Sequence, residues 1–266
     1  MAELFKAWDF DGSVLIGCAA LLAGWWITHR GDYQHAAWFG SGVGLMLFAL
    51  TSPLDTLGDE YLFSAHMGQH LLLELAIPPL LLLGIGPRFA QLVVDSPLGR
   101  IERVLGKPLL AWTLGMGTLA LWHIPALYDA ALRSEDIHIV EHLSFMTTAT
   151  IFWWPVLAPI HSRRISPLWT QLYLLAGALT GSLLGIWLTF ATHVLYLPYL
   201  HTRDSLHIAT LLRSQWGMTP LIDQQAGGLL MWVGGGFIFL TAMLALFLQW
   251  SADDASIATR IPETQR

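Results

Sequence analysis

Long apolar runs alternate with short polar segments along the whole chain. Seven runs can be counted, most of them close to the roughly 20 residues that cross a bilayer as a helix. Their predicted bounds are 13–28, 36–51, 61–83, 108–125, 137–157, 168–192 and 223–250. We therefore expect an all-α, polytopic membrane protein. It would be a single domain of seven transmembrane helices over residues 1–250, followed by a polar cytoplasmic tail at 251–266.

The composition is typical of a protein that lies in a lipid bilayer. Of 266 residues, 55% are hydrophobic and 12% charged, against about 25% charged in a typical soluble domain. The net charge of −6 argues against nucleic acid as a partner. Cys18 is the one cysteine, so an internal disulfide or a thiolate cluster is excluded. Any metal site must use His, Met, carboxylate or backbone ligands.

Basic residues orient the predicted helices, because cytoplasmic loops carry an excess of Lys and Arg. If the N-terminus is outside, an odd number of spans places the C-terminus inside. The inner segments then hold nine of the 13 basic residues: Arg30, Arg88, Arg100, Arg103, Lys107, Arg163, Arg164, Arg260 and Arg266. The outer segments hold Lys6, Arg133, Arg203 and Arg213. We therefore predict an outer N-terminus and an inner C-terminus.

This topology brings eight of the 11 histidines to the outer side. His66 and His70 begin the third run, and His138 and His142 begin the fifth. Both pairs are spaced i, i+4, which places each pair on one helix face. Glu74 continues the face of the first pair. Ionisable groups at membrane depth are costly and usually functional, although a polar seam that only holds helices together is the simpler alternative.

Helical i, i+4 histidine pairs can bind one metal ion. His123 ends the fourth run and Asp223 opens the seventh, both at the predicted outer side. Neutral imidazole suits copper and zinc, a nearby carboxylate such as Glu74 or Glu141 can act as a ligand or orient a ring, and the thioether of Met67 or Met231 would favour Cu(I). The candidate metal ligands are His66, His70, His123, His138, His142 and Asp223.

Four ordered motifs carry a family resemblance. They are His66-Met67-Gly68-Gln69-His70 with Pro78-Pro79, Trp122-His123-Ile124-Pro125, Glu141-His142-Leu143-Ser144-Phe145 with Trp153-Trp154-Pro155, and Asp223-Gln224-Gln225-Ala226-Gly227-Gly228. Over about residues 10–250 the chain resembles the polytopic CtaG-type cytochrome c oxidase assembly factors. That resemblance implies seven spans in a bacterial inner membrane. It also implies a role in maturing a haem-copper oxidase, with an oxidase subunit as client and copper as the metal. It supplies no ligand set.

The leading hypothesis is thus a copper-binding assembly factor that is not an enzyme. One alternative is a seven-span zinc hydrolase in which three histidines and Asp223 hold zinc, assisted by Ser64 or Ser144. Another is a haem protein with axial histidines. A retinal protein is excluded because Lys6 and Lys107, the only lysines, lie outside the apolar runs. The sequence also allows a homodimer.

Overall fold

The computed structural model describes residues 7–29 and 33–260. Within this part of the chain all regular structure is helical, which confirms the predicted all-α class. The long helices are α1 (Gly12–Thr28), α2 (Ala36–Thr51), α8 (Pro108–Trp122), α10 (Glu135–Leu157), α11 (Pro167–Thr189) and α13 (Gly235–Arg260). The shorter ones are α3 (Pro53–Thr56), α4 (Phe63–Leu71), α5 (Ile77–Leu83), α6 (Pro87–Asp95), α7 (Leu98–Leu105), α9 (Pro125–Arg133) and α12 (Pro220–Leu229).

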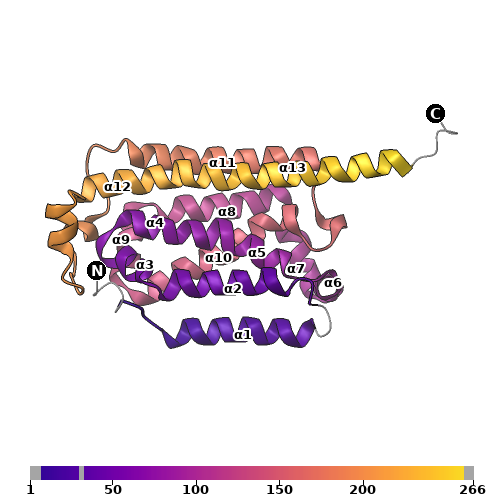
Figure 1. Cartoon of the computed structure of the whole chain (residues 1–266), viewed down its shortest axis with the longest axis horizontal. Helices are drawn as coiled ribbons and strands as arrows, with labels where there is room; N and C mark the ends of the chain where they lie inside the picture. The colour runs from indigo at the N-terminus through magenta and orange to yellow at the C-terminus, as the bar shows by residue number, and fades with distance from the viewer. Residues whose placement is uncertain (1–6, 30–32, 261–266) are drawn as a thin grey trace.

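The long helices run roughly parallel to one axis and form a bundle (Figure 1). α1 lies along one edge next to α2, and α11 and α13 lie along the opposite edge. The helices α4, α5, α8 and α10 fill the space between them. The main core is aromatic, with Phe152, Trp153, Tyr173 and Phe239 in one buried cluster. These residues come from α10, α11 and α13, so α10, which carries His138 and His142, also contributes to the main core.

Proline fixes where many of these helices begin. α3, α6, α8, α9, α11 and α12 each have proline at their first residue. Proline lacks an N–H, which the first turn of a helix does not need, and its φ angle is already helical. This is why the start of the fourth predicted run, at Pro108, agrees with α8.

The third predicted run is interrupted within its length. α4 is followed by the π-helical turn η3 (Leu72–Ala76) and then by α5, which has prolines in its first turn. A π-turn inserts one extra residue into a helix and rotates the side chains that follow it. The π-turn also accepts a hydrogen bond from another helix, because the indole N–H of Trp153 in α10 donates to the carbonyl of Glu74 at 3.0 Å. Further π-turns occur at η2 (Leu57–Tyr61), η6 (Leu211–Gln215) and η7 (Leu230–Gly234).

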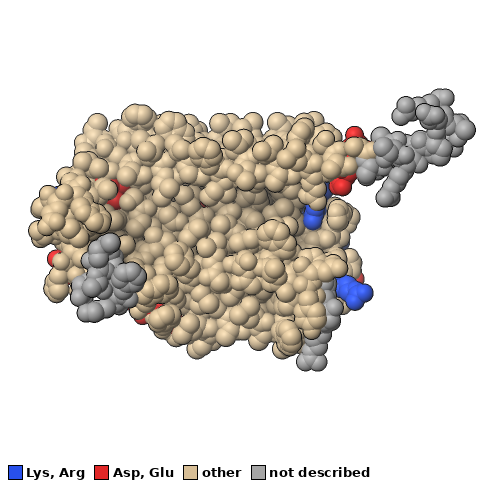
Figure 2. All heavy atoms as spheres, viewed as in Figure 1, with Lys and Arg blue, Asp and Glu red and all other residues tan. Residues whose placement is uncertain are grey.

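The helices and the surface both fit a membrane environment. By length and apolar composition, three segments of the described chain can cross a bilayer: Phe63–Leu83, Pro167–Thr189 and Pro220–Ala255. The number rises to five if two bent helix pairs each count as one span, and α1 is a shorter apolar helix. Figure 2 shows charged side chains near the two ends of the long axis and none across the middle of this face. All seven predicted runs are helical, but seven spans remain a prediction.

The predicted polar tail is not separated from the last helix. α13 continues past residue 251 and ends at Arg260. In Figure 1 it extends beyond the rest of the bundle. The rest of the predicted tail, 261–266, lies outside the described residues. The last helix therefore continues about ten residues beyond the end of the apolar run, into polar sequence.

Candidate metal centre

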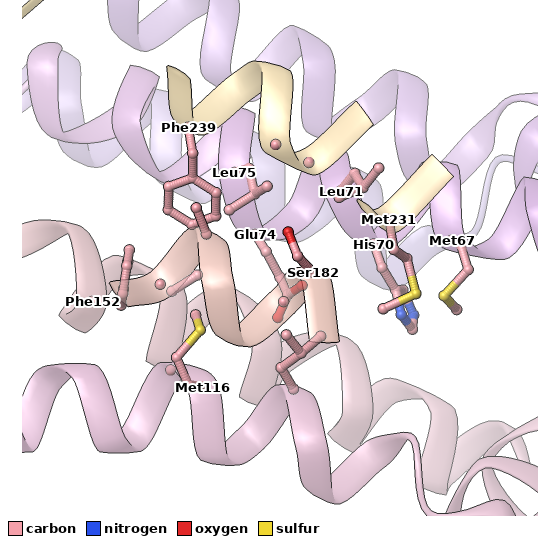
Figure 3. A pocket seen from close by; sticks show the side chains of 18 of the residues that line it. Met67, His70, Leu71, Glu74, Leu75, Met116, Phe152, Ser182, Met231 and Phe239 are labelled. Atoms are coloured by element: carbon pink, nitrogen blue, oxygen red, sulfur yellow. The ribbon is translucent and has the colours of Figure 1, made fainter. Parts of the chain in front are cut away.

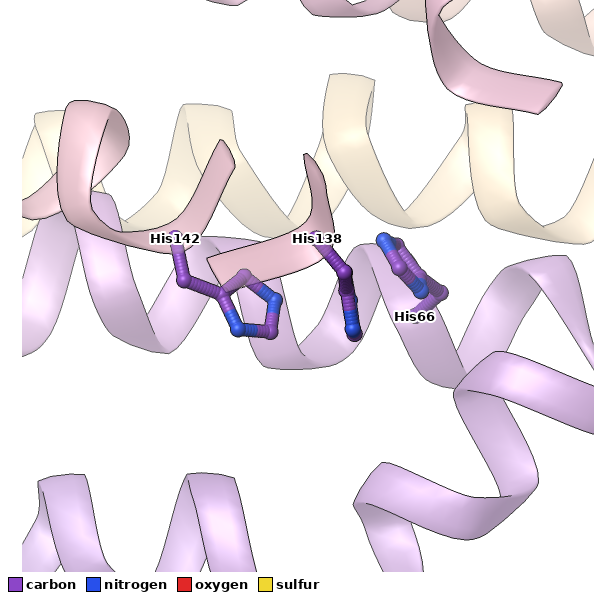
Figure 4. A group of neighbouring side chains, drawn as sticks. All are labelled: His66, His138 and His142. Atoms are coloured by element: carbon purple, nitrogen blue, oxygen red, sulfur yellow. The ribbon is translucent and has the colours of Figure 1, made fainter. Parts of the chain in front are cut away.

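Two helices bring four histidines together near one end of the bundle. His66 and His70 lie one turn apart on α4, and their ring centroids are 4.2 Å apart. His138 and His142 lie one turn apart on α10, with centroids 4.1 Å apart. The two pairs face each other, with 5.5 Å between the rings of His66 and His138 and 5.6 Å between those of His70 and His142. Figure 4 shows His138 and His142 on neighbouring turns, with His66 beside them.

Two overlapping sets of three side chains have the spacing of metal ligands. His66, His138 and His142 form one set, and His66, His70 and Glu141 form the other. In each set the ligand atoms lie within 4.8 Å of one another. Metal–nitrogen and metal–oxygen bonds of about 2.0–2.2 Å place two ligands of one ion about 3–4 Å apart. Small side-chain movements would therefore close either set around an ion. We call His66, His70, His138, Glu141 and His142 the histidine cluster.

Four members of the histidine cluster are buried and His142 is partly exposed, and no hydrogen bond joins these five side chains. His66 and Glu141 are fully buried, and His70 is 2% exposed. Both ring nitrogens of His66 and of His70, both carboxylate oxygens of Glu141, and Nε2 of His138 and of His142 lack a hydrogen-bond partner among the described residues. Buried polar atoms in native proteins are nearly always paired, and each unpaired one is costly. A bound metal ion would take up one ligand atom from each member of a set of three, so the donor set fits a metal.

Asp59 joins the histidine cluster from the π-turn η2. Its carboxylate oxygens lie 3.4 Å from Nδ1 of His66 and 3.5 Å from Nδ1 of His138, in neither case as a hydrogen bond. Gly58 permits this approach, because a Cβ atom there would lie 3.0 Å from the Cα of His66. The Asp59 side chain is 29% exposed, whereas the histidines beside it are buried. Asp59 can therefore orient a ligand ring or coordinate an ion at the open side of the site.

A tyrosine pair supports the same π-turn. The hydroxyl of Tyr199 donates to the carbonyl of Gly58 at 2.7 Å and accepts from Tyr128 at 2.8 Å. Burial raises the pKa of Tyr199, which lies in the loop before α12, well above its ordinary value. The hydroxyl therefore stays protonated and remains a donor. Tyr128 in turn packs against His66, with ring centroids 5.2 Å apart.

An acidic cleft leads from the surface to the histidine cluster. This cleft encloses about 1000 Å³, and His138 and His142 are part of its wall, together with residues of α1 and α2. Its carboxylates are Asp9, Asp11, Asp55, Asp59, Glu60 and Glu135, against which Arg133 and Arg203 are the basic residues. A cleft lined mainly by one sign of charge concentrates ions of the opposite sign. The arrangement favours the approach of a cation.

Asp223 belongs to neither set of three, and its carboxylate makes other contacts. Its carboxylate accepts hydrogen bonds from the backbone N–H of Phe63 at 2.7 Å, the backbone N–H of Ser64 at 3.2 Å and the Ser64 hydroxyl at 2.6 Å. Asp223 of α12 thus caps the start of α4. Leu62, which occupies the N-cap position of α4, has no side chain that can do so. Gly227 permits the contact, because a Cβ atom there would overlap the ring of Phe63. The oxygens that we predicted for metal are used in capping.

His123 also lies outside the histidine cluster. Its Nδ1 lies 2.7 Å from the carbonyl of Leu119, and its Nε2 lies 3.3 Å from the sulfur of Met67. Glu74 lies within the π-turn η3 and belongs to neither set of three. It lines a separate pocket in the bundle interior, together with His70 and His123. Of the six predicted ligands, the structure brings together His66, His70, His138 and His142.

Sequence reasoning gave too little weight to Glu141 and missed Asp59. Glu141 has a local signal, because it lies three residues after His138 on the same helix, where i, i+3 side chains are neighbours. Its oxygen is 4.0 Å from Nε2 of His138. Asp59 has no comparable signal. Its position depends on a π-turn and on the close approach of two backbone segments at Gly58.

Comparison with known proteins places the chain in one family. A family model described as the cytochrome c oxidase caa3 assembly factor (Caa3_CtaG) matches residues 19–253. This match confirms the resemblance seen in the motifs. An uncharacterized protein of Mycobacterium leprae is 24% identical over 98% of the chain, and uncharacterized proteins of Mycobacterium bovis and Mycobacterium tuberculosis are each 25% identical. The chain spans 42% of the length of these relatives. No solved structure matches it.

Proposed function

The chain belongs to the cytochrome c oxidase caa3 assembly factor family, and we propose that it is an integral membrane factor that supplies copper to a haem-copper oxidase. Copper is bound by the histidine cluster at the outer, periplasmic side of a bacterial inner membrane. It then passes to an oxidase subunit that docks at the same end. The protein acts as a chaperone for a metal and not as an enzyme.

One observation carries this proposal. His66, His70, His138 and Glu141 are buried together, with the partly exposed His142 beside them, and their ring nitrogens and carboxylate oxygens include atoms without partners. A structural polar seam would be expected to pair those atoms with each other or with the backbone. The donor set is instead arranged as two sets of three with ligand spacing. Neutral imidazole with carboxylate binds Cu(II) well and zinc somewhat less strongly, and the family membership favours copper.

The distribution of charge supports the orientation. The acidic cleft opens at the end of the bundle that holds the histidine cluster, and α6 and α7, which carry Arg88, Arg100 and Arg103, lie at the other end (Figure 1). An excess of basic residues marks the cytoplasmic side. With seven spans, the N-terminus is outside and the C-terminus inside.

The geometry also supports release of the metal. A protein that transfers copper needs an ion that remains accessible to an incoming ligand. Asp59, whose side chain is 29% exposed, borders the histidine cluster on the side that faces the acidic cleft. A ligand of the client can enter there while His66 and His70 remain on the buried side. The exchange needs no net change in the oxidation state of copper.

The zinc hydrolase alternative receives less support. Its assisting residues would be Ser64 and Ser144. The Ser64 hydroxyl donates to Asp223. The Ser144 hydroxyl donates to the Glu141 carbonyl and accepts from the indole N–H of Trp122. Both hydroxyls are thus engaged in contacts that hold helices in place, and Asp223 is engaged in capping.

The test is oxidase maturation in cells that depend on this protein. Cells expressing His142→Ala should assemble an oxidase with less copper and lower activity, although membranes contain normal amounts of the variant. His161→Ala is the matched control, because His161 lies in the exposed turn η4 (His161–Arg163) away from the cluster. Full copper content in the oxidase of His142→Ala and His138→Ala cells would overturn the proposal.

A further inference from the structure

A second group of metal-binding atoms lies next to the histidine cluster, inside the bundle. A pocket there is lined by His70, His123, Met67, Met231 and, further along, Met116. Met67 is 1% exposed and Met231 is 7% exposed. Figure 3 shows the sulfur atoms of Met67 and Met231 beside the ring nitrogens of His70, and Met116 near Phe152 at the other end of the pocket. The pocket therefore has one end that is rich in soft ligand atoms.

The contact between His123 and Met67 joins two electron-pair donors. The Leu119 carbonyl can only accept, so Nδ1 of His123, 2.7 Å away, carries the proton. In a neutral imidazole the other nitrogen, Nε2, then presents a lone pair. This lone pair faces the thioether sulfur of Met67 at 3.3 Å, and sulfur also has only lone pairs to offer. No proton in this arrangement joins the two atoms.

The same geometry suits two ligands of one metal ion. Metal–nitrogen bonds of about 2.0 Å and metal–sulfur bonds of about 2.3 Å place the two ligand atoms about 3–4 Å apart. The carbonyl of Leu119 also fixes the tautomer of His123, which is how metal-binding histidines are commonly oriented. Thioether sulfur is a soft ligand and selects Cu(I) over harder divalent ions. The unpartnered ring nitrogens of His70 border the same end of the pocket.

We propose that Nε2 of His123 and the sulfur atoms of Met67 and Met231 form a second metal site, selective for Cu(I). The site lies inward of the histidine cluster, and His70 stands between the two. This inference rests on the proposed role in copper handling and adds a distinct site to it. It also gives a task to His123, which the sequence predicted as a candidate ligand and which the histidine cluster leaves out.

The test uses the full chain in mild detergent, loaded with Cu(I) under reducing conditions. X-ray absorption at the copper edge should show sulfur bound to copper in the wild type. Met67→Leu and Met231→Leu should remove sulfur from the copper environment and lower the affinity for Cu(I) by at least about tenfold, measured against a competing Cu(I) chelator. Both changes nearly preserve side-chain volume, so the bundle should remain folded. Met116→Leu is the matched control, because Met116 lines the same pocket at its other end.

Each result separates this inference from the proposed function. Cu(I) bound by nitrogen and oxygen alone, with Met67→Leu equal to wild type, overturns the second site and leaves the histidine cluster untouched. Equal losses in Met116→Leu and Met67→Leu also overturn it, because the effect is then not specific to the named ligands. Sulfur-bound Cu(I) that depends on Met67 and Met231 in the purified protein supports the second site. If the oxidase copper of His142→Ala cells is at the same time unaffected, the proposed function is contradicted while the second site stands.

Discussion

The Nε2 atom of His70 lies 4.0 Å from Oε1 of Glu141. This distance is too long for a hydrogen bond and slightly longer than the separation of two ligands on one ion. Both atoms are buried and have no partner among the described residues. The pair is thus costly in the metal-free protein and becomes favourable when an ion is bound between its members. The predictions below follow from this relationship and from the contacts around it.

Replacing Glu141 with leucine should stabilise the metal-free protein. The change removes a fully buried carboxylate that has no hydrogen-bond partner, a group whose burial costs about 1–3 kcal/mol. It also removes a ligand. The thermal midpoint of the metal-free variant should therefore rise, and the further rise that wild type shows with added Cu(II) should shrink. A lower midpoint without metal, and an unchanged response to Cu(II), would mean that Glu141 is paired and is not a ligand.

Replacing Asp223 with alanine should destabilise the protein and leave its metal site intact. The carboxylate accepts from two backbone N–H groups and one hydroxyl at the start of α4. Their loss as partners should cost about 1–3 kcal/mol, seen as a lower thermal midpoint. Copper per folded chain, measured at saturating metal, should equal that of wild type. Loss of copper from a variant with an unchanged midpoint would restore Asp223 as a ligand.

Replacing Gly58 with alanine should weaken metal binding, although Gly58 itself is not a ligand. The new Cβ would lie 3.0 Å from the Cα and 3.1 Å from the backbone nitrogen of His66. Because that neighbour is backbone, η2 must move, and Asp59 moves with it. Titration with Cu(II) should give a lower affinity. Gly40→Ala provides the control, since no atom lies within 4 Å of a Cβ at Gly40, and equal affinities in the two variants would contradict the role given to Asp59.

Neutralising the acidic cleft should slow the uptake of metal without changing how much is bound. Glu60→Gln together with Glu135→Gln removes two of its charges, and neither residue belongs to the histidine cluster. Stopped-flow mixing with Cu(II) should give a lower association rate at low ionic strength, and the difference should diminish as salt screens the remaining charges. An unchanged rate at low salt would show that cations do not enter by this route.

Local sequence rules predicted the helices and the histidine pairs well, because both depend on short-range geometry. The i, i+4 spacing on α4 and α10 produces the observed neighbours His66–His70 and His138–His142. Glu74 lies inside the π-turn η3, where the spacing of a regular α-helix does not apply. Asp223 was predicted from the topology, and no local pattern indicates that its carboxylate caps a helix 160 residues earlier in the chain. Such contacts depend on how helices pack, and neither periodicity nor spacing carries that information.

The central claim is tested most directly by the copper content of the purified protein. Full-length protein in mild detergent is loaded with Cu(II), and bound metal is measured by mass spectrometry and by electron paramagnetic resonance on the same sample. We expect about one Cu(II) per chain with nitrogen ligands, and its loss when His70 and His142 are replaced by alanine. Copper that stays at the same stoichiometry, with an unchanged spectrum, in the His70→Ala, His142→Ala double variant would contradict the account.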